Sequence, residues 1–108
     1  METLRNQSNH QPYRDEHLYV DLRRELVTLD SQILPLTQKE YCLLLLLVQH
    51  PGEALPRATL EKQLSAGSRM LDAYVRGLRG KLGIYGEQYI ETVRGIGYRF
   101  RRAFLPRG

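Results

Sequence analysis

The stretch Arg69-Met-Leu-Asp-Ala-Tyr-Val-Arg-Gly-Leu-Arg-Gly-Lys-Leu82 decides how the rest of this chain is expected to fold. Its apolar residues recur at helical spacing, and at about 100° per residue they fall on one narrow stripe suited to a hydrophobic core. These apolar residues are Leu71, Val75, Leu78 and Leu82. Arginines and very small residues lie opposite the stripe, namely Arg69, Ala73, Arg76 and Gly80. The stretch therefore predicts a helix over 69–82 that packs on one side and presents a basic, uncrowded surface on the other.

Two runs of β-branched and aromatic residues follow between residues 89 and 102, on either side of Gly95-Ile96-Gly97. This pattern predicts a β-hairpin with a glycine-dependent turn. We expect Tyr98 and Phe100 to belong to the hairpin core rather than to serve as base-stacking platforms. A helix with one basic face and a basic hairpin after it indicates a winged helix, and the DNA major groove, about 12 Å wide, admits one such helix.

Further helices are predicted upstream of residue 69. Thr37 and Glu40 form the pattern of a capping box, which starts a helix that runs to Val48 and ends before Pro51. The segment 57–64 predicts a second helix, and Ser68 is the expected N-cap of the helix over 69–82. Gly83 occupies the place where a helix commonly ends in a left-handed residue.

The start of the chain predicts a tail followed by a small sheet. Residues 1–17 are polar and show no sustained apolar period, so we expect a flexible tail or linker there. Short apolar pieces between Leu18 and Leu36 predict an antiparallel meander. The expected organisation is one winged-helix domain over 18–104, with a short tail over 105–108. The fold class is α+β, with an N-terminal antiparallel sheet, three helices and a C-terminal hairpin wing.

Charge is distributed unevenly along the 108 residues. Residues 1–68 contain seven Lys/Arg and nine Asp/Glu, whereas residues 69–108 contain nine Lys/Arg and three Asp/Glu. The two balances are −2 and +6, so basic charge gathers on the predicted helix and hairpin, as expected of a surface that faces polyphosphate.

Other function classes find little support in the sequence. The longest aliphatic run, Leu43 to Val48, is too short to span a membrane. The lone Cys42 lies in an apolar stretch and is expected to be a buried thiol in a cytoplasmic protein. We find no paired carboxylates, metal-ligand spacing or nucleophile with a base, so we expect neither an enzyme nor a cofactor or metal site.

Four blocks of the chain resemble the effector domain of OmpR/PhoB-type bacterial response regulators. They are Leu36-Thr-Gln-Lys-Glu-Tyr41, Arg57-Ala-Thr-Leu60, Leu71-Asp-Ala-Tyr-Val-Arg-Gly-Leu-Arg-Gly-Lys-Leu82 and Glu91-Thr-Val-Arg-Gly-Ile-Gly-Tyr-Arg-Phe100. The resemblance covers about residues 18–102. It implies a winged helix-turn-helix that binds double-stranded promoter DNA on direct repeats as a head-to-tail pair. It also implies control by phosphorylation of a receiver domain in a sensor-kinase pathway.

The resemblance also assigns DNA-contacting positions to this chain. On the helix these are Arg69, Ala73, Tyr74, Arg76, Gly77 and Arg79, and on the hairpin they are Thr92 and Arg94. Family members can contact RNA polymerase through the turn before this helix. That turn usually carries a tryptophan and is longer than Leu64–Ser68 here, so polymerase stays an open partner.

The residues themselves leave several roles open. Arg69 and Arg76 suit guanine edges or phosphates. Arg79 could bind a phosphate, bind a base or form an ion pair with Asp72. Gly77 and Gly80 each cost a helix about 1 kcal/mol relative to alanine, which indicates either close approach of the backbone to DNA or plain tolerance of glycine. The rival function is a winged-helix module that binds protein or RNA. A protein-binding surface would be expected to have an uncharged centre.

Overall fold

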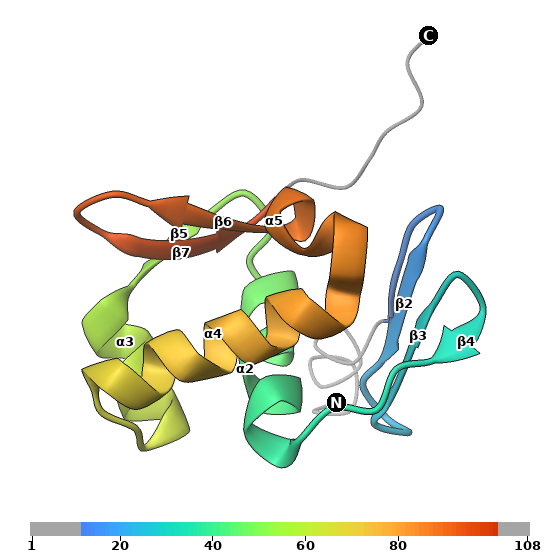
Figure 1. Ribbon diagram of the computed structural model, residues 1–108, viewed down its shortest axis with the longest axis horizontal. Coiled ribbons are helices and arrows are strands. Elements are labelled where there is room, and N and C mark those ends of the chain that lie inside the picture. Colours follow the sequence, from blue (N-terminus) through green and yellow to red (C-terminus); the bar gives the residue numbers. More distant parts are fainter. Residues whose placement is uncertain (1–11, 102–108) are drawn as a thin grey trace, which may run out of the picture. The chain divides into compact units, whose positions relative to one another are not determined.

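The computed structural model describes residues 12–101, which fall into two compact units, residues 12–35 and 36–101. Of the predicted tail over 1–17, residues 1–11 lie outside the described residues, as does the predicted tail over 105–108. The first unit holds a four-stranded sheet, and the second holds the helices and a three-stranded sheet (Figure 1).

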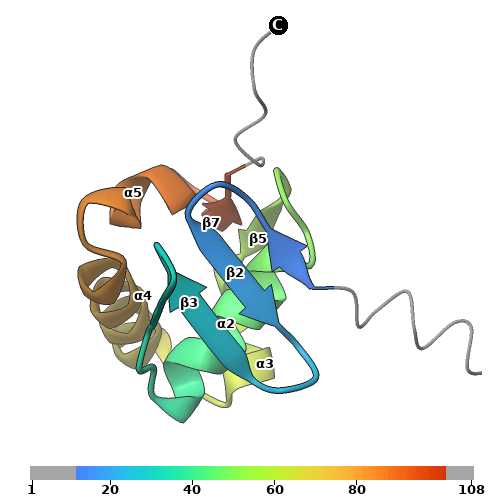
Figure 2. The ribbon, with the colours of Figure 1, turned by 90° about the vertical axis from the view of Figure 1, so that its right-hand side faces the viewer.

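The N-terminal unit is an antiparallel meander, as predicted. Its strands are β1 (Tyr13–Arg14), β2 (Leu18–Asp21), β3 (Leu26–Leu29) and β4 (Gln32–Ile33), and they lie in the order β1-β2-β3-β4. The central strands β2 and β3 are visible in blue and cyan in Figure 2. Asp30 and Ser31 have φ angles of 50° and 70°. Positive φ at both central residues is what a two-residue type I′ hairpin turn requires, so this pair closes the β3–β4 hairpin.

Strand β1 was not predicted, since the sequence analysis assigned no regular structure before Leu18. Asp15 supplies the missing turn: its carboxylate accepts hydrogen bonds from the backbone N–H groups of His17 and Leu18, both at 2.8 Å. This side-chain cap folds the chain back, so that Tyr13 lies opposite Val20 and Arg14 opposite Tyr19. The tail prediction is therefore wrong for Tyr13–Arg14.

The C-terminal unit contains the three predicted helices, α2 (Gln38–Val48), α3 (Arg57–Leu64) and α4 (Ser68–Leu82). It adds a 3-10 turn, η1 (Gly83–Tyr85), and a short helix, α5 (Gly86–Tyr89), before the hairpin strands β6 (Ile90–Val93) and β7 (Gly97–Phe100). Gly83 ends α4 with a positive φ of 63°, but its ψ of −128° differs from the left-handed helical conformation that was expected there.

The core of this unit is made by one side of each helix together with the hairpin. The predicted stripe of α4 is buried, and the capping box of α2 is present, with hydrogen bonds of 3.2 Å and 3.0 Å between Thr37 and Glu40. Cys42 is half-exposed rather than buried, because it lies on the side of α2 that carries the exposed Gln38. The buried side chains of the unit include Leu43, Leu44, Leu47, Leu60, Leu64, Leu71, Val75, Leu78, Leu82, Tyr89, Ile90 and Phe100.

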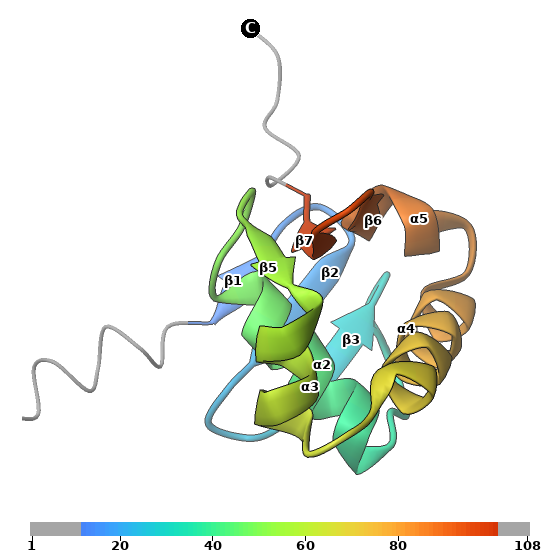
Figure 3. The same ribbon diagram turned by 90° about the vertical axis from the view of Figure 1, so that its left-hand side faces the viewer.

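The hairpin is the edge of a larger sheet than the sequence indicated. Ala54–Pro56 forms strand β5, which pairs with β7 and gives the order β5-β7-β6 (Figure 3). Gly97 permits this pairing, because a Cβ atom there would overlap the backbone carbonyl oxygen of Leu55. Gly95 has a separate role: its φ of 80° lets the Ile96 N–H donate to the Val93 carbonyl at 2.9 Å and close the turn.

A carboxylate links α2 to α4 on the side away from the hairpin. Glu40 accepts from Lys81 Nζ at 2.7 Å as well as from the Thr37 N–H, and the Glu40 side chain is only 9% exposed. Burial opposes ionisation of Glu40, but the hydrogen bonds from Lys81 and Thr37 outweigh it and lower its pKa. Gly77 makes room for this carboxylate, since a Cβ atom at residue 77 would overlap Glu40 Oε2.

We predict opposite effects for alanine at the two glycines of α4. Nothing lies within 4 Å of a Cβ atom at Gly80, so Gly80→Ala should raise the free energy of unfolding by about 1 kcal/mol through helix propensity. Gly77→Ala should instead lower it by about 0.5–2 kcal/mol. The methyl group displaces Glu40, and hydrogen bonds to a charged group are worth about 1.5–3 kcal/mol. Urea unfolding of both variants measures the difference.

The Glu40→Ala background is the control for that comparison. Without the carboxylate, Gly77→Ala should stabilise the protein as Gly80→Ala does. Equal stabilisation by both alanines in the unsubstituted protein would contradict the role given to Gly77.

Candidate nucleic-acid interface

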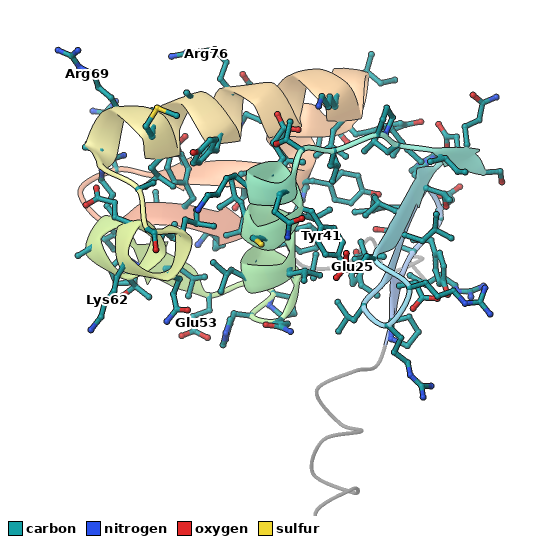
Figure 4. The ribbon with its side chains drawn as sticks, turned by 90° about the horizontal axis from the view of Figure 1, so that it is seen from below. Glu25, Tyr41, Glu53, Lys62, Arg69 and Arg76 are labelled. Carbon is teal, nitrogen blue, oxygen red and sulfur yellow. The ribbon has the colours of Figure 1, made fainter. Side chains whose placement is uncertain are left out.

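The outward side of α4 has the composition that the sequence analysis predicted. Arg69 and Arg76 are exposed, and neither side chain makes a hydrogen bond or an ion pair with any residue of the described chain. In Figure 4 both side chains project from the side of α4 that faces away from α2 and α3. Ala73 and Gly80 lie between and beside them by helical spacing, so this side carries two long cations and little other bulk.

Three other residues of the predicted set lie on the flanks of α4. Gly77 faces Glu40 of α2, which explains the glycine by packing inside the protein. Tyr74, three residues before Gly77, is half-buried on the same flank by helical spacing. Arg79 lies on the opposite flank and turns toward the hairpin, where its Nη2 atom is 2.7 Å from the Ile90 carbonyl oxygen. The predicted positions therefore do not form one continuous surface.

A network around Asp72 joins α4 to α3 and β7. The Asp72 carboxylate accepts from Arg57 Nη1 and from the Tyr98 hydroxyl, both at 2.8 Å. Arg57 is thus the partner of Asp72, and the Arg79–Asp72 pairing that the sequence left open is not formed. The hydrogen bond from Arg57, followed by that from Tyr98, lowers the pKa of Asp72, and the charge of Arg76 adds a smaller effect in the same direction.

The same arginine changes the role expected of Ser68. The predicted N-cap is wrong, because Ser68 is the first residue of α4, Gly67 holds the cap position, and no side chain caps the helix. The Ser68 hydroxyl instead accepts from Arg57 Nη2 at 2.6 Å, and the Ser68 carbonyl accepts at 3.2 Å. Arg57 therefore holds the N-terminal end of α4 from outside the helix.

The hairpin has one inward and one outward face. Tyr98 and Phe100 are buried, as predicted for core residues, and Phe100 stacks on Tyr89 with ring centroids 5.6 Å apart. Arg99 pairs with Glu91 across the strands at 2.7 Å. Thr92 and Arg94 are both exposed, and within residues 12–101 Arg94 has no hydrogen bond or ion pair.

The cations of the C-terminal unit thus separate into two groups. Arg57, Arg79, Lys81 and Arg99 each have acceptors inside the protein. On α4 and the hairpin turn, Arg69, Arg76 and Arg94 have none among the described residues. On α4 and the hairpin turn, these three arginines are therefore the cations that remain available to an anionic partner. We call them the unpaired arginines.

Two further features bear on function. Within residues 12–101, no group of three or more His, Cys, Asp or Glu side chains is placed to hold a metal ion. In the same residues, no helix combines the length and the apolar character that crossing a membrane would need.

Comparison with known proteins identifies the family. Residues 30–100 match the family described as "Transcriptional regulatory protein, C terminal". The transcriptional activator protein IrlR of Burkholderia pseudomallei is 40% identical over 87 residues, which cover 75% of this chain and 38% of IrlR. The transcriptional regulatory protein CusR of Escherichia coli is 37% identical over the same length, with the same coverage of each chain. The chain thus spans about two fifths of the length of these relatives.

Solved structures agree with the sequence match. The DNA-binding domain of Klebsiella pneumoniae RstA, in complex with the RstA box, has a TM-score of 0.76 and 27% identity, over 85% of this chain and 98% of that one. The DNA-binding domain of AdeR, in complex with an intercistronic region, has a TM-score of 0.71 and 30% identity, over 83% and 96%. The chain therefore belongs to the transcriptional regulatory protein C-terminal family, the winged-helix effector domains of OmpR/PhoB-type response regulators.

Proposed function

We propose that this domain binds double-stranded DNA sequence-specifically as the effector of a bacterial transcriptional regulator, with α4 in the major groove and the β6–β7 turn at the adjacent minor groove. The observation that carries the proposal is the set of unpaired arginines on exposed parts of α4 and the hairpin, in a unit whose other α4 and hairpin cations are already bonded internally. The similar DNA-binding domains of RstA and AdeR, solved in complex with the RstA box and with an intercistronic region, support it.

The exposed residues suit different parts of a duplex. Arg69 and Arg76 can each donate two hydrogen bonds to a guanine edge or bind phosphates. Ala73 keeps the helix surface low between them and can contact a thymine methyl group. Arg94 leads into the hairpin turn, where a cation is attracted by the negative potential of a narrow minor groove. Tyr74 and Gly77 keep a secondary place in the proposal, at the rim of this surface.

The whole protein's partners are part of the proposal as well. Three partners are proposed for a regulator of this family. They are a second copy bound head-to-tail on direct repeats, a receiver domain controlled by a sensor kinase, and RNA polymerase. The cytoplasm is the proposed compartment, because promoter DNA lies there in bacteria.

Salt dependence of duplex binding tests the central proposal. Neutralising one phosphate changes the slope of log affinity against log salt by about −0.9, so the unpaired arginines should give a slope of about −2 to −3 for each bound copy, with the smaller magnitude when Arg76 binds a base. Fluorescence anisotropy of labelled duplex DNA, titrated at several salt concentrations, measures it. A slope near zero, or equally tight binding to hairpin RNA, would favour a protein- or RNA-binding module instead.

Arg76→Ala should cost about 1–3 kcal/mol of specific binding and relax the preference at one base position. Binding-site selection with the unsubstituted and substituted domains measures both effects. Lys62→Ala is the matched control, because Lys62 lies on α3, on the side of the unit opposite Arg76 (Figure 4). The Lys62→Ala domain should bind DNA as tightly as the unsubstituted domain. Equal losses on specific and random DNA would make Arg76 a phosphate contact rather than a base contact.

Head-to-tail binding predicts a dependence on half-site spacing. Direct repeats about 10–11 base pairs apart place both copies of α4 on one face of the duplex, since one turn is about 10–10.5 base pairs. Cooperative filling should be lost on insertion of about five base pairs and partly restored by about ten. Quantitative footprinting of the spacing series tests this, and cooperativity on inverted repeats would exclude the arrangement.

A further inference from the structure

The guanidinium group of Arg79 spans the gap between α4 and the hairpin. Its Nε and Nη2 atoms donate to the Ile90 carbonyl oxygen at 3.0 Å and 2.7 Å, and Nη2 also donates to Thr92 Oγ1 at 2.9 Å. The same group lies 5.7 Å from the centroid of the Tyr98 ring. One edge of the guanidinium is therefore occupied inside the protein.

The residues held by Arg79 fix where β6 lies against α4. Ile90 is fully buried and pairs with Phe100, and Thr92 pairs with Tyr98 two positions further along the same face of the hairpin. A fork that bonds the first and third residues of β6 determines both the distance of that strand from α4 and its position along the helix. A lysine cannot reproduce this, because its ammonium group lacks the planar fork.

The contact also constrains the hydroxyl group of Thr92. A hydroxyl has one donor and two acceptor sites, and here one lone pair accepts from Arg79. No described residue accepts a hydrogen bond from the Thr92 hydroxyl group, and residue 92 is exposed. The O–H hydrogen is therefore free for an outside group that can only accept, such as a phosphate oxygen.

We propose that Arg79 is a positioning residue that aligns the hairpin with α4 and presents Thr92 as a hydrogen-bond donor to a DNA phosphate, rather than a residue that binds DNA itself. This inference rests on the proposed DNA binding, and it departs from the family resemblance, which placed residue 79 among the direct contacts. The unpaired arginines supply the positive charge that attracts DNA, and Arg79 holds the hairpin and the Thr92 hydroxyl in position.

The slope of log affinity against log salt separates the two roles. A direct phosphate contact at Arg79 would make the slope about 0.9 less steep in Arg79→Ala, as is expected for the control Arg94→Ala. A positioning residue leaves the slope unchanged. We expect Arg79→Ala to bind about tenfold more weakly at every salt concentration, because the neutral donor Thr92 is misplaced. The β6–β7 pairing and the buried Tyr98 and Phe100 still hold the turn that carries Arg94, so the number of phosphate-bound cations stays the same.

Thr92 variants test whether Arg79 acts through that hydroxyl. Thr92→Val should also bind about tenfold more weakly with an unchanged slope, and Thr92→Ser, which keeps the donor, should bind normally. The double variant Arg79→Ala/Thr92→Val should lose about tenfold, not about a hundredfold, since both changes remove one contact. An additive loss would overturn the inference.

Arg79→Lys keeps the charge and serves as the conservative variant, with the thermal unfolding midpoint checked for each protein. We expect it to bind as weakly as Arg79→Ala. Binding equal to that of the unsubstituted domain, or a slope that falls by about 0.9 in Arg79→Ala, would overturn the positioning role while the proposed function stands. Failure of the unsubstituted domain to bind duplex DNA would refute the proposed function itself.

Discussion

The carboxylate of Asp72, in the N-terminal part of α4, accepts one hydrogen bond from α3 and one from β7, both at 2.8 Å. A single anion therefore fixes the angle of α4 to the helix before it and to the sheet beside it. Arg57, the donor from α3, also reaches the first residue of α4 and lies 5.9 Å from the centre of the Tyr98 ring. The direction in which Arg69 and Arg76 point follows from this arrangement, since both belong to the same rigid helix as Asp72.

Internal pairing decides which part of the charge is available to a partner. Lys81 is bound by Glu40 on one flank of α4, and Arg79 is bound by the hairpin on the other, so the remaining cations of the helix point outward. The half-buried cations needed acceptors, because an unpaired charge away from water is costly. Their acceptors come from segments distant in sequence, which keeps the outward side of α4 clear of carboxylates other than the already bonded Asp72.

Sequence reasoning recovered the features that depend on local pattern. The 3.6-residue period located the buried stripe of α4 and, opposite it, Arg69, Ala73 and Arg76, and the capping box located the start of α2. The pairing of β1 with β2 and of β5 with β7 was missed, because segments of two or three residues carry no period that could indicate a partner strand. The family resemblance placed Gly77 and Arg79 among the DNA contacts. No sequence pattern could have indicated their partners inside the protein, Glu40 and Ile90, because these lie far away in sequence.

The open space above Gly80 makes this position a natural starting point for changing what the helix recognises. A side chain introduced there meets no neighbouring atom, and leaving glycine behind favours the helix. A glutamine or lysine at 80 could therefore add a new base contact without disturbing the packing of the domain. Position 77 offers no such freedom, since any side chain there competes with a carboxylate that the fold needs. Diversification of binding preference in engineered versions of this domain is thus expected to proceed through residue 80 before residue 77.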